Sequence, residues 1–535
     1  MMSIADELKL IARGEILSDE WNREVYSVDA SHYSIKPSVI LFPLDEDDLA
    51  EICRYGYSKN VSITARGAGT GLLGQSLNDN IIIDFTKHMN KILEIESDHV
   101  LVQPGIVKGV LDKELKKKGK FLPPDPASSN YCTIGGMIAN NSSGVHTLGY
   151  GSIIDYLDTI NVAYSDGNLR TIGSGDTIAN TNTNTNINYD KRYTDDDKDD
   201  KDDKDDKDDK DDKIEKLYRL LSLCSNIELI EYKYPNVTKN SCGYRLDEVI
   251  KDKKFNAHKL FAASEGTLGL VTSAKLRIMD IPLYRTTIVF GFNDLLSAMR
   301  AVPFILKFSP VALEVMDETV LQNFQESFYK VTSKDGRHRG NGCLLYVEFA
   351  GDNLIDVEQK FAGCKEKLSS MSTVLESVSD EQSSERIWRA RKNALNNITK
   401  LTVGSRKPLG LIEDTVVSPN VLCDYAEFIL QKYIENKLDY VIYGHAGNGN
   451  LHTRPMINIE SQNEIKLYDH LAEEVFTKAI SYGGTITGEH GDGIARTKYI
   501  EFMYGSQIVS IFQQIKKIFD PKFIMNPGKK VVNRL

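Results

Sequence analysis

The sequence lacks a run of about 18 apolar residues, the least that a membrane-spanning helix needs. It also lacks a basic, apolar leader, because its first residues (MMSIADELKLIARGE) predict an amphipathic helix that carries acids. The seven cysteines are scattered and form no CxxC pair, which argues for a reducing compartment and against an iron–sulfur cluster or structural zinc in this chain. We therefore expect a cytoplasmic protein without a transmembrane segment, with peripheral membrane association left open.

Positive charge is scarce as well. The formal net charge is -11, and the run 195–213, with thirteen Asp and six Lys, accounts for -7 of it. The remaining -4 leaves no basic excess for nucleic-acid binding. Neither this run nor the alternating Asn and Thr before it can bury apolar surface, so we predict a disordered insertion over about residues 177–213.

A chain of 535 residues predicts two or three domains. From residue 284 onward, apolar strand patterns alternate with amphipathic helices, which indicates an α+β domain whose sheet is covered by helices. We predict four parts: an N-terminal helical segment (1–37), a first domain (38–280), a second domain (281–500), and a C-terminal segment that returns to the first domain (501–535).

The first domain contains a glycine-rich loop, RGAGTGLLGQS, after a predicted strand. Gly69, Gly71 and Gly74 match GxGxxG, but a Rossmann motif opens a long helix, whereas here IIIDF at 81–85 predicts the next strand almost at once. We interpret the loop as a backbone nest for phosphate. The later segment FLPPDPASSNYCTIGGMIANNSSG is rich in Pro, Gly and small residues yet contains apolar ones, which indicates packing around a ligand.

Two other glycine-rich segments carry imidazoles, YGHAGNGNLH (443–452) and TGEHGDGIAR (487–496). They supply His445, His452, Glu489 and His490. Three such groups suit a divalent transition ion with an open coordination position, and the fourth is left as a base. Each segment alone is more simply a tight turn. Two of them in one chain favour a metal site.

The motifs RGAGTG, VQPG, PPDPAS, TIGGMIANNSSG, SEGTLGLVT and NPGK occur in this order between residues 38 and 529. In them the chain resembles the FAD-linked oxidoreductases of the vanillyl-alcohol oxidase and p-cresol methylhydroxylase superfamily. YGHAGNGNLH and TGEHGDG resemble its branch of D-lactate dehydrogenases, glycolate oxidase flavin subunits and D-2-hydroxyglutarate dehydrogenases. The resemblance implies an α+β fold: a two-part FAD-binding domain of the p-cresol methylhydroxylase type, plus an α+β cap domain with an antiparallel sheet covered by helices.

The resemblance also implies non-covalent FAD, because members with a covalent link often have a histidine where this chain has Arg66. The residues implied to bind FAD are Arg66, Gly67, Ala68, Gly69, Thr70, Gly71, Leu72, Pro126, Ser128, Thr133, Gly135, Gly136, Asn140, Ser142, Gly144, Glu265, Gly266 and Asn526.

The same resemblance assigns roles around the imidazoles. It implies a metal, zinc before manganese or iron, on His445, His452 and Glu489, a general base in His490, and substrate binding by Arg391 and Asn450. In the implied reaction a D-2-hydroxy acid chelates the metal, His490 takes the hydroxyl proton, and hydride passes from Cα to flavin N5. The product is the 2-oxo acid.

The substrate and the electron acceptor are less defined. D-2-hydroxyglutarate dehydrogenases carry a lysine where this chain reads IEDT, and Glu413 would repel a second carboxylate, so we expect D-lactate or glycolate. The alternatives are a D-2-hydroxyglutarate dehydrogenase and a non-catalytic flavin-binding subunit of a larger redox complex. Electrons are expected to leave to a separate, non-NAD acceptor, which is an electron-transfer protein, an iron–sulfur protein, a quinone or a cytochrome. A homodimer is a further expectation.

Overall fold

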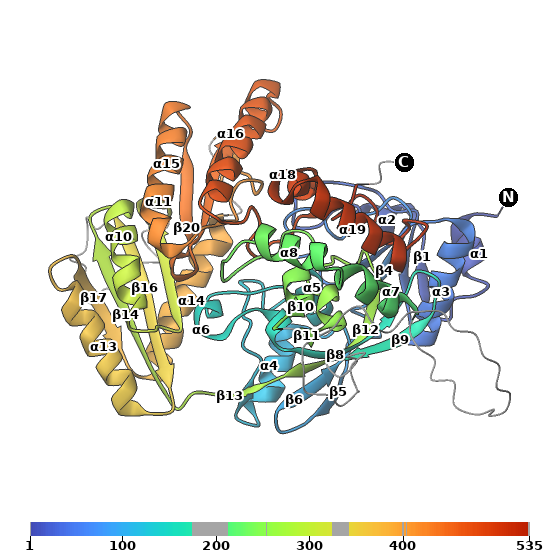
Figure 1. Cartoon of the computed structure of the whole chain (residues 1–535), viewed down its shortest axis with the longest axis horizontal. Coiled ribbons are helices and arrows are strands. Elements are labelled where there is room, and N and C mark those ends of the chain that lie inside the picture. Colours follow the sequence, from blue (N-terminus) through green and yellow to red (C-terminus); the bar gives the residue numbers. More distant parts are fainter. Residues whose placement is uncertain are drawn as a thin grey trace.

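The structure, a computed structural model, describes residues 2–173, 212–252, 254–323, 342–398, 401–402 and 404–532. The predicted insertion lies outside the described residues except for its last two positions, which begin α7 (Asp212–Leu221). In Figure 1 the second domain lies at the left and the first domain at the right. The chain leaves the first domain after β13 (Met279–Asp280).

The first domain begins with a small sheet of strand order β1-β2-β4-β3. Its parallel strands are β2 (Val39–Phe42), β4 (Ile81–Asp84) and β3 (Ile63–Arg66), and β2 leads into α3 (Glu46–Lys59). The apolar run at 38–42 thus forms a strand, and the helix after it begins at Glu46. The N-terminal segment differs from the helical prediction, because between α1 (Ile4–Leu8) and α2 (Glu20–Val25) it adds β1 (Glu15–Leu17), antiparallel to β2.

The glycine-rich loop joins β3 directly to its parallel neighbour β4, and residues 67–80 contain no helix. The rejection of a Rossmann motif is therefore confirmed. A short helix, α5 (Ile134–Asn140), begins instead in the second glycine-rich segment, where the Thr133 hydroxyl accepts a hydrogen bond from the Gly136 N–H. Both segments face the same region of the domain.

The second sheet of the first domain is antiparallel. Its strands, in spatial order, are β5 (Ile92–Ile95), β6 (His99–Val102), β12 (Leu270–Arg277), β8 (Leu157–Ala163) and β9 (Leu169–Gly173). β8 and β9 form a hairpin around the turn SDGN (165–168). The helices α4 (Lys108–Lys116) and α8 (Cys224–Lys233) also belong to this part of the molecule.

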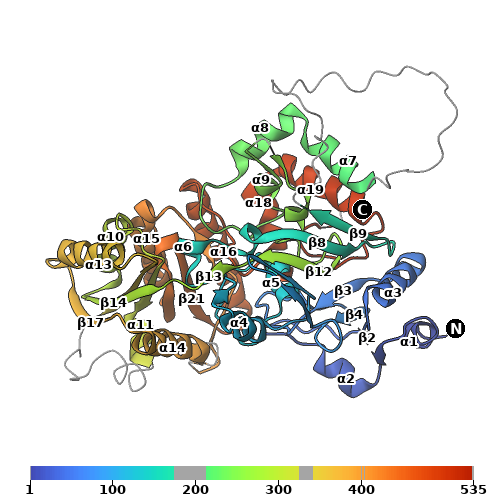
Figure 2. The same ribbon diagram turned by 90° about the horizontal axis from the view of Figure 1, so that it is seen from below.

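The second domain is built on an antiparallel sheet of eight strands. They are β17 (Thr373–Val378), β14 (Tyr284–Phe292), β16 (Cys343–Gly351), β15 (Ala312–Asp317), β20 (Tyr440–His445), β21 (Asn450–Ile457) and β18 (Lys407–Pro408), with β19 (Thr415–Val416) also on β21. One face packs on α10 (Leu295–Leu306), α13 (Leu354–Leu368), α15 (Leu422–Glu435) and α16 (Gln462–Ser481). The other packs on α11 (Glu318–Asn323) and α14 (Glu381–Ile398), as Figure 2 shows. The α+β cap is confirmed.

The segment LGLIEDTVV (409–417) forms only β19 and a buried turn before it. Glu413 and Asp414, in that turn, are completely buried. Buried carboxylates need several hydrogen-bond donors, which a regular sheet ladder does not supply. The backbone here departs from the ladder and presents both carboxylates to donors on other segments.

The C-terminal segment lies against β3 of the first sheet. After α18 (Ile500–Tyr504) and α19 (Ser506–Phe519), the chain runs beside β3. The Ile63 N–H donates to the Ile524 carbonyl at 2.8 Å, and the Asn526 N–H donates to the Ile63 carbonyl at 2.8 Å. Residues 524–526 therefore extend the first sheet.

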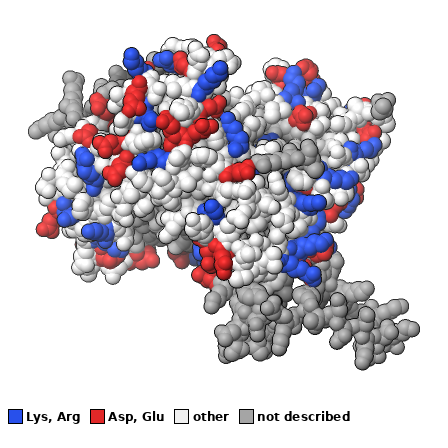
Figure 3. Space-filling model, turned by 45° about the horizontal axis from the view of Figure 1, so that its top comes forward, with Lys and Arg blue, Asp and Glu red and all other residues white. Residues whose placement is uncertain are grey.

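The surface carries charges of both signs. On the face drawn in Figure 3, acidic and basic side chains are interspersed, with no extended basic surface. Among the described residues, no helix is both long and apolar enough to cross a bilayer.

Candidate active site

A cavity of about 360 Å³ lies between the two domains. The first domain contributes the two glycine-rich segments and the turn around Glu265. The second domain contributes Arg391, Tyr443, His445, His452, Arg454, Glu489 and His490. Ligand cavities usually have volumes of roughly 300–1,000 Å³. The position and size therefore suit a bound cofactor and a small substrate.

Exposed backbone forms the first-domain wall. A Cβ on Gly67 would lie 2.1 Å from Thr133 Oγ1, so a side chain there would push the first loop away from α5. Gly69 has φ +64°, a conformation that favours glycine. Within the described residues, none of the N–H groups of residues 67–72 donates a hydrogen bond to a protein acceptor. Such a row of free N–H groups is a nest for an anion such as phosphate.

The four imidazole-segment residues meet at the opposite wall. His445 ends β20 and His452 lies in β21, which pairs with it, while Glu489 and His490 follow α16. The Nε2 atoms of the three histidines lie 2.9, 3.3 and 3.7 Å from Glu489 Oε1, in the order His445, His452, His490. The rings of His452 and His490 are stacked, with centroids 4.9 Å apart. All three imidazoles thus direct Nε2 at one carboxylate oxygen.

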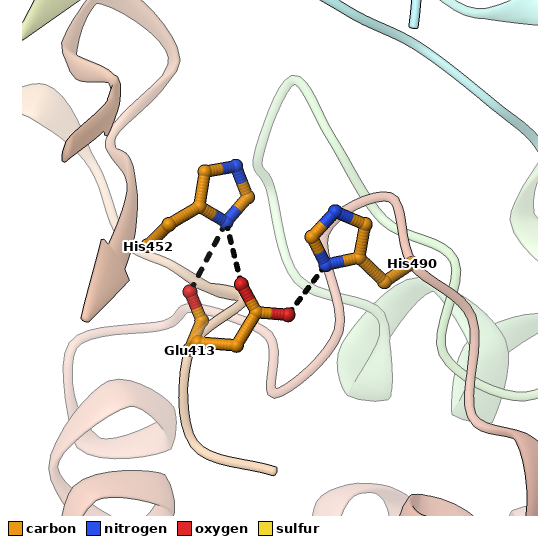
Figure 4. A group of neighbouring side chains, drawn as sticks. All are labelled: Glu413, His452 and His490. Atoms are coloured by element: carbon orange, nitrogen blue, oxygen red, sulfur yellow. Dashed lines mark hydrogen bonds and ion pairs between the residues drawn. The ribbon is translucent and has the colours of Figure 1, made fainter. Parts of the chain in front are cut away.

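Two buried glutamates orient these rings. Nδ1 of His445 lies 2.6 Å from Glu314 Oε1. Glu413 lies between the other two rings, with Oε2 3.0 Å from His452 Nδ1 and Oε1 2.5 Å from His490 Nδ1 (Figure 4). A carboxylate on Nδ1 fixes the tautomer and leaves Nε2 available as a metal ligand or base.

Each glutamate also holds a guanidinium of the cavity wall. Glu314 pairs with Arg391, and Glu413 Oε2 lies 3.2 Å from Arg454 Nη2. Burial raises the pKa of Glu413, but His490 and Arg454 outweigh it and hold that pKa well below its usual range. Glu413 is therefore a carboxylate whose charge is already satisfied.

The pKa values of Glu489 and His452 are shifted in opposite directions. Burial raises the pKa of Glu489, yet Lys239 and His445 keep it well below its usual range. Burial lowers the pKa of His452, and hydrogen bonds to Glu413 and Glu489 raise it to about 9. One ligand atom from each of His445, His452 and Glu489 lies within 4.8 Å of the others, so these residues could hold one divalent cation, which would displace a proton from the imidazole.

Two family models match the sequence, the "FAD binding domain" over residues 37–173 and the "FAD linked oxidases, C-terminal domain" over residues 281–530. The chain belongs to the FAD-linked oxidases. It is similar to the D-2-hydroxyglutarate dehydrogenase of Haemophilus influenzae, with 30% identity over 96% of this chain and 50% of that protein. The chain thus spans about half the length of that relative.

The chain also resembles the D-lactate dehydrogenase of Anaerostipes hadrus, with 25% identity over 98% of this chain and 96% of that protein. Among solved structures it resembles p-cresol methylhydroxylase with substrate bound, at a TM-score of 0.67 and 14% identity over 99% of this chain and 96% of that one. At such low identity the structural likeness shows the fold, and the expected p-cresol methylhydroxylase-type fold is confirmed.

The cavity wall of this FAD-linked oxidase contains all the residues predicted to bind FAD except Gly144 and Asn526. Gly144 packs against the Asp125 carbonyl, which a Cβ would meet at 2.3 Å. Asn526 lies behind the wall, where its Nδ2 donates to the carbonyls of Gln75 at 3.0 Å and Glu265 at 2.6 Å. These two residues support the loops of the wall, and the free N–H nest makes the wall itself a fit for FAD.

The two residues predicted to bind substrate are placed differently. Arg391 lines the cavity, and its buried Nε has no hydrogen-bond partner among the described residues. Asn450 is fully buried and is not part of the wall. Its Nδ2 donates to Asp414 Oδ1 at 3.2 Å and to the Thr415 carbonyl at 3.1 Å. The structure thus brings Arg391 to the cavity and leaves Asn450 behind it.

The expectation that Glu413 faces the substrate is wrong. Glu413 has no exposed surface, and its two oxygens are occupied by His452, His490 and Arg454. A second substrate carboxylate would meet the Arg454 guanidinium before it met this acid. The physical reason given for preferring a monocarboxylate therefore does not hold.

Sequence reasoning missed Glu314, Arg454 and Lys239. Lys239 is completely buried, and its Nζ lies 2.8 Å from Glu489 Oε2. Glu314 had a signal, since an acid inside the apolar strand VALEVMD is unusual unless it has a partner. A signal existed for Arg454 as well. It follows His452 by two residues in the same strand, and residues two apart on a strand point to the same face.

Proposed function

We propose that this protein is an FAD- and metal-dependent dehydrogenase that oxidises a D-2-hydroxy acid to the 2-oxo acid and delivers the electrons to a separate acceptor. The observation that carries the proposal is the convergence of three imidazole Nε2 atoms on Glu489 Oε1, in a cavity whose other wall is the FAD-binding loop. The names of the two relatives support it, since both denote enzymes of D-2-hydroxy acids.

His490 is the proposed general base. Its Nδ1–H donates to Glu413, so the lone pair of the neutral ring is on Nε2. Its side chain is 22% exposed, whereas those of His445 and His452 are 7% and 3% exposed, so it is the imidazole that substrate and water reach. Nε2 of His490 would accept the hydroxyl proton of the substrate.

His445, His452 and Glu489 are the proposed metal ligands. Ser143 Oγ and Lys239 Nζ occupy Glu489 Oε2 at 2.6 and 2.8 Å, which leaves Oε1 as the ligand atom. A bound divalent cation, zinc before manganese or iron, would supply positive charge for the oxygens of the substrate. Bound FAD, held without a covalent link, would supply the two-electron oxidant.

Arg391 is the proposed partner of the substrate carboxylate. Glu314 binds its Nη2, and its unpartnered Nε is the buried donor that a carboxylate would satisfy. Glu314 also orients His445. One carboxylate therefore positions both the proposed substrate-binding arginine and a proposed metal ligand. Their relative position is thereby fixed before substrate binds.

The test is anaerobic reduction of the purified, FAD-loaded and metal-loaded protein. D-lactate, glycolate and D-2-hydroxyglutarate are offered separately, with L-lactate as the stereochemical control. We expect the flavin colour to bleach with at least one D-2-hydroxy acid and to persist with L-lactate. Persistent colour with every 2-hydroxy acid would leave a non-catalytic flavin-binding subunit as the function.

A further inference from the structure

Lys239 is a buried lysine of the first domain that contacts a proposed metal ligand of the second. Its side chain is fully buried, and its Nζ lies 2.8 Å from Glu489 Oε2. Among the residues that the structure describes, Glu489 is the only hydrogen-bond or ion-pair partner of this ammonium group. Burying an ammonium is costly, and a buried ion pair often adds no stability compared with apolar residues of similar size. Stability alone is therefore a poor reason for a lysine at this position.

The charges around the imidazoles are paired. In the described part of the chain, four carboxylates contact the three imidazoles of the site, and each of them pairs with a cation. The pairs are Glu314–Arg391, Glu413–Arg454, Asp414–Arg496 and Glu489–Lys239. Of these carboxylates, only that of Glu489 is a proposed metal ligand. Lys239 is therefore the cation that acts directly on the ligand set.

Glu489 is also held by contacts that do not involve Lys239. Ser143 Oγ donates to the same oxygen, Oε2, at 2.6 Å. The Glu489 N–H donates to Asp414 Oδ2 at 3.0 Å, which fixes the backbone of the ligand. Loss of the ammonium would thus change the charge beside Glu489 more than its position.

A cation beside a metal ligand changes how strongly that ligand binds the metal. A carboxylate that shares its charge with an ammonium is a weaker donor, and a bound divalent cation then keeps more positive charge for its other ligands. We infer that Lys239 sets this balance: its ammonium weakens Glu489 as a metal ligand and so strengthens the attraction of the bound cation for the hydroxyl oxygen of the substrate. The inference rests on the proposed function and concerns the same site. Lys239 lies outside the cavity wall and acts only through Glu489.

The first test measures metal affinity. Zn²⁺ is titrated into the metal-free, FAD-loaded protein in competition with a chromophoric chelator. Lys239→Gln keeps a donor for Glu489 but removes the charge, so Zn²⁺ should bind at least ~10-fold more tightly than to the wild type. Lys239→Arg keeps the charge and should bind Zn²⁺ about as tightly as the wild type does. Lys108→Met is the matched control, because it removes a buried lysine that pairs with Asp112 on α4, and it should leave the affinity unchanged.

The second test measures the rate of flavin reduction at saturating Zn²⁺ and saturating D-2-hydroxy acid. Lys239→Gln should be roughly 10-fold slower than the wild type, because the cation polarises the substrate hydroxyl less strongly. Lys239→Arg should retain most of the rate. Tighter metal binding together with slower reduction identifies a charge effect, since a displaced Glu489 would lower both the affinity and the rate.

Unchanged or weaker Zn²⁺ binding by a Lys239→Gln protein that retains FAD would overturn the inference. Should that variant lose FAD, Lys239→Met is measured by the same criterion, because a buried site tolerates an apolar side chain of similar length better than an amide. Failure of the proposed function is distinct from both outcomes. In that case the wild type itself would bind no Zn²⁺, or would reduce its flavin with no 2-hydroxy acid.

Discussion

Glu413 accepts a hydrogen bond from Nδ1 of His490 across 2.5 Å, and this contact determines which nitrogen of the ring can act as a base. The same carboxylate lies against His452, so one buried acid aligns a proposed base and a proposed metal ligand.

Glu413→Gln should slow flavin reduction by a D-2-hydroxy acid roughly 10–100-fold, because the neutral amide orients His490 less firmly and does not stabilise its charged form. Rapid-mixing anaerobic spectroscopy measures the rate at saturating substrate. Glu464→Gln removes a carboxylate that pairs with Arg406 away from the cavity and serves as the control. An unchanged rate in Glu413→Gln would mean that His490 needs no orienting carboxylate.

His445→Ala should release the metal and abolish turnover while FAD stays bound, because the ligand set and the FAD loops belong to different domains. The metal content is measured by elemental analysis and the flavin content by absorbance, both on the same sample. His470→Ala, which changes an exposed histidine, is the control. Full metal content and full turnover in His445→Ala would show that the YGHAGNGNLH segment is only a turn.

Gly67→Ala should yield a protein that purifies without FAD. The new methyl group would lie 2.1 Å from Thr133 Oγ1, so the first loop and the start of α5 must separate. Gly351→Ala is the control, since its Cβ would meet nothing closer than 3.6 Å. The measurement is the flavin content per polypeptide. A Gly67→Ala protein with full flavin content would show that FAD does not bind at the first loop.

His146 joins the two domains and makes their stability depend on pH. Its Nδ1 lies 2.7 Å from Asp125 and its Nε2 3.1 Å from Glu348. Burial lowers the pKa of His146, but these acids raise it from 6.5 to about 10. Because the folded-state pKa is the higher one, the stabilisation is complete below pH 6.5 and is lost as pH rises toward 10.

The measurement is Tm of the wild type and of His146→Gln against pH. We expect the variant to melt several degrees lower near pH 6, since about 1 kcal/mol corresponds to roughly 2–4 °C in a large domain. That difference should narrow steadily up to pH 10. A constant difference over this range would assign the effect to packing, without a contribution from the imidazolium charge.

Sequence patterns predicted most of the fold because most elements are amphipathic or wholly apolar. The strand VILF of β2 and the spacing of apolar residues in α3 are examples, and both occur where expected. β1 was missed because its three residues, Glu15 to Leu17, carry no alternation and only its pairing with β2 makes it a strand. Tertiary pairing of this kind has no local signal.

The residues that meet at the candidate site were predicted, and the residues that support them were missed. The glycine-rich segments reveal the histidines, because two such segments with imidazoles in one chain favour a shared site over two plain turns. Glu413 was assigned to the substrate because sequence does not show whether a carboxylate is buried against other groups. Arg454 was missed because sequence does not show which face of β21 lines the cavity.

The contact of the C-terminal segment with β3 also concerns biosynthesis. Thr64 Oγ1 donates to Asn526 Oδ1 at 2.9 Å across 462 residues of sequence, and Asn526 in turn holds the loops at Gln75 and Glu265. A ribosome that has made the glycine-rich loop has not yet made the residues that brace it. Contacts so distant in sequence form late in folding. Flavin loading is thus expected to follow synthesis of residues 524–526, and a nascent chain stalled before residue 524 should be colourless.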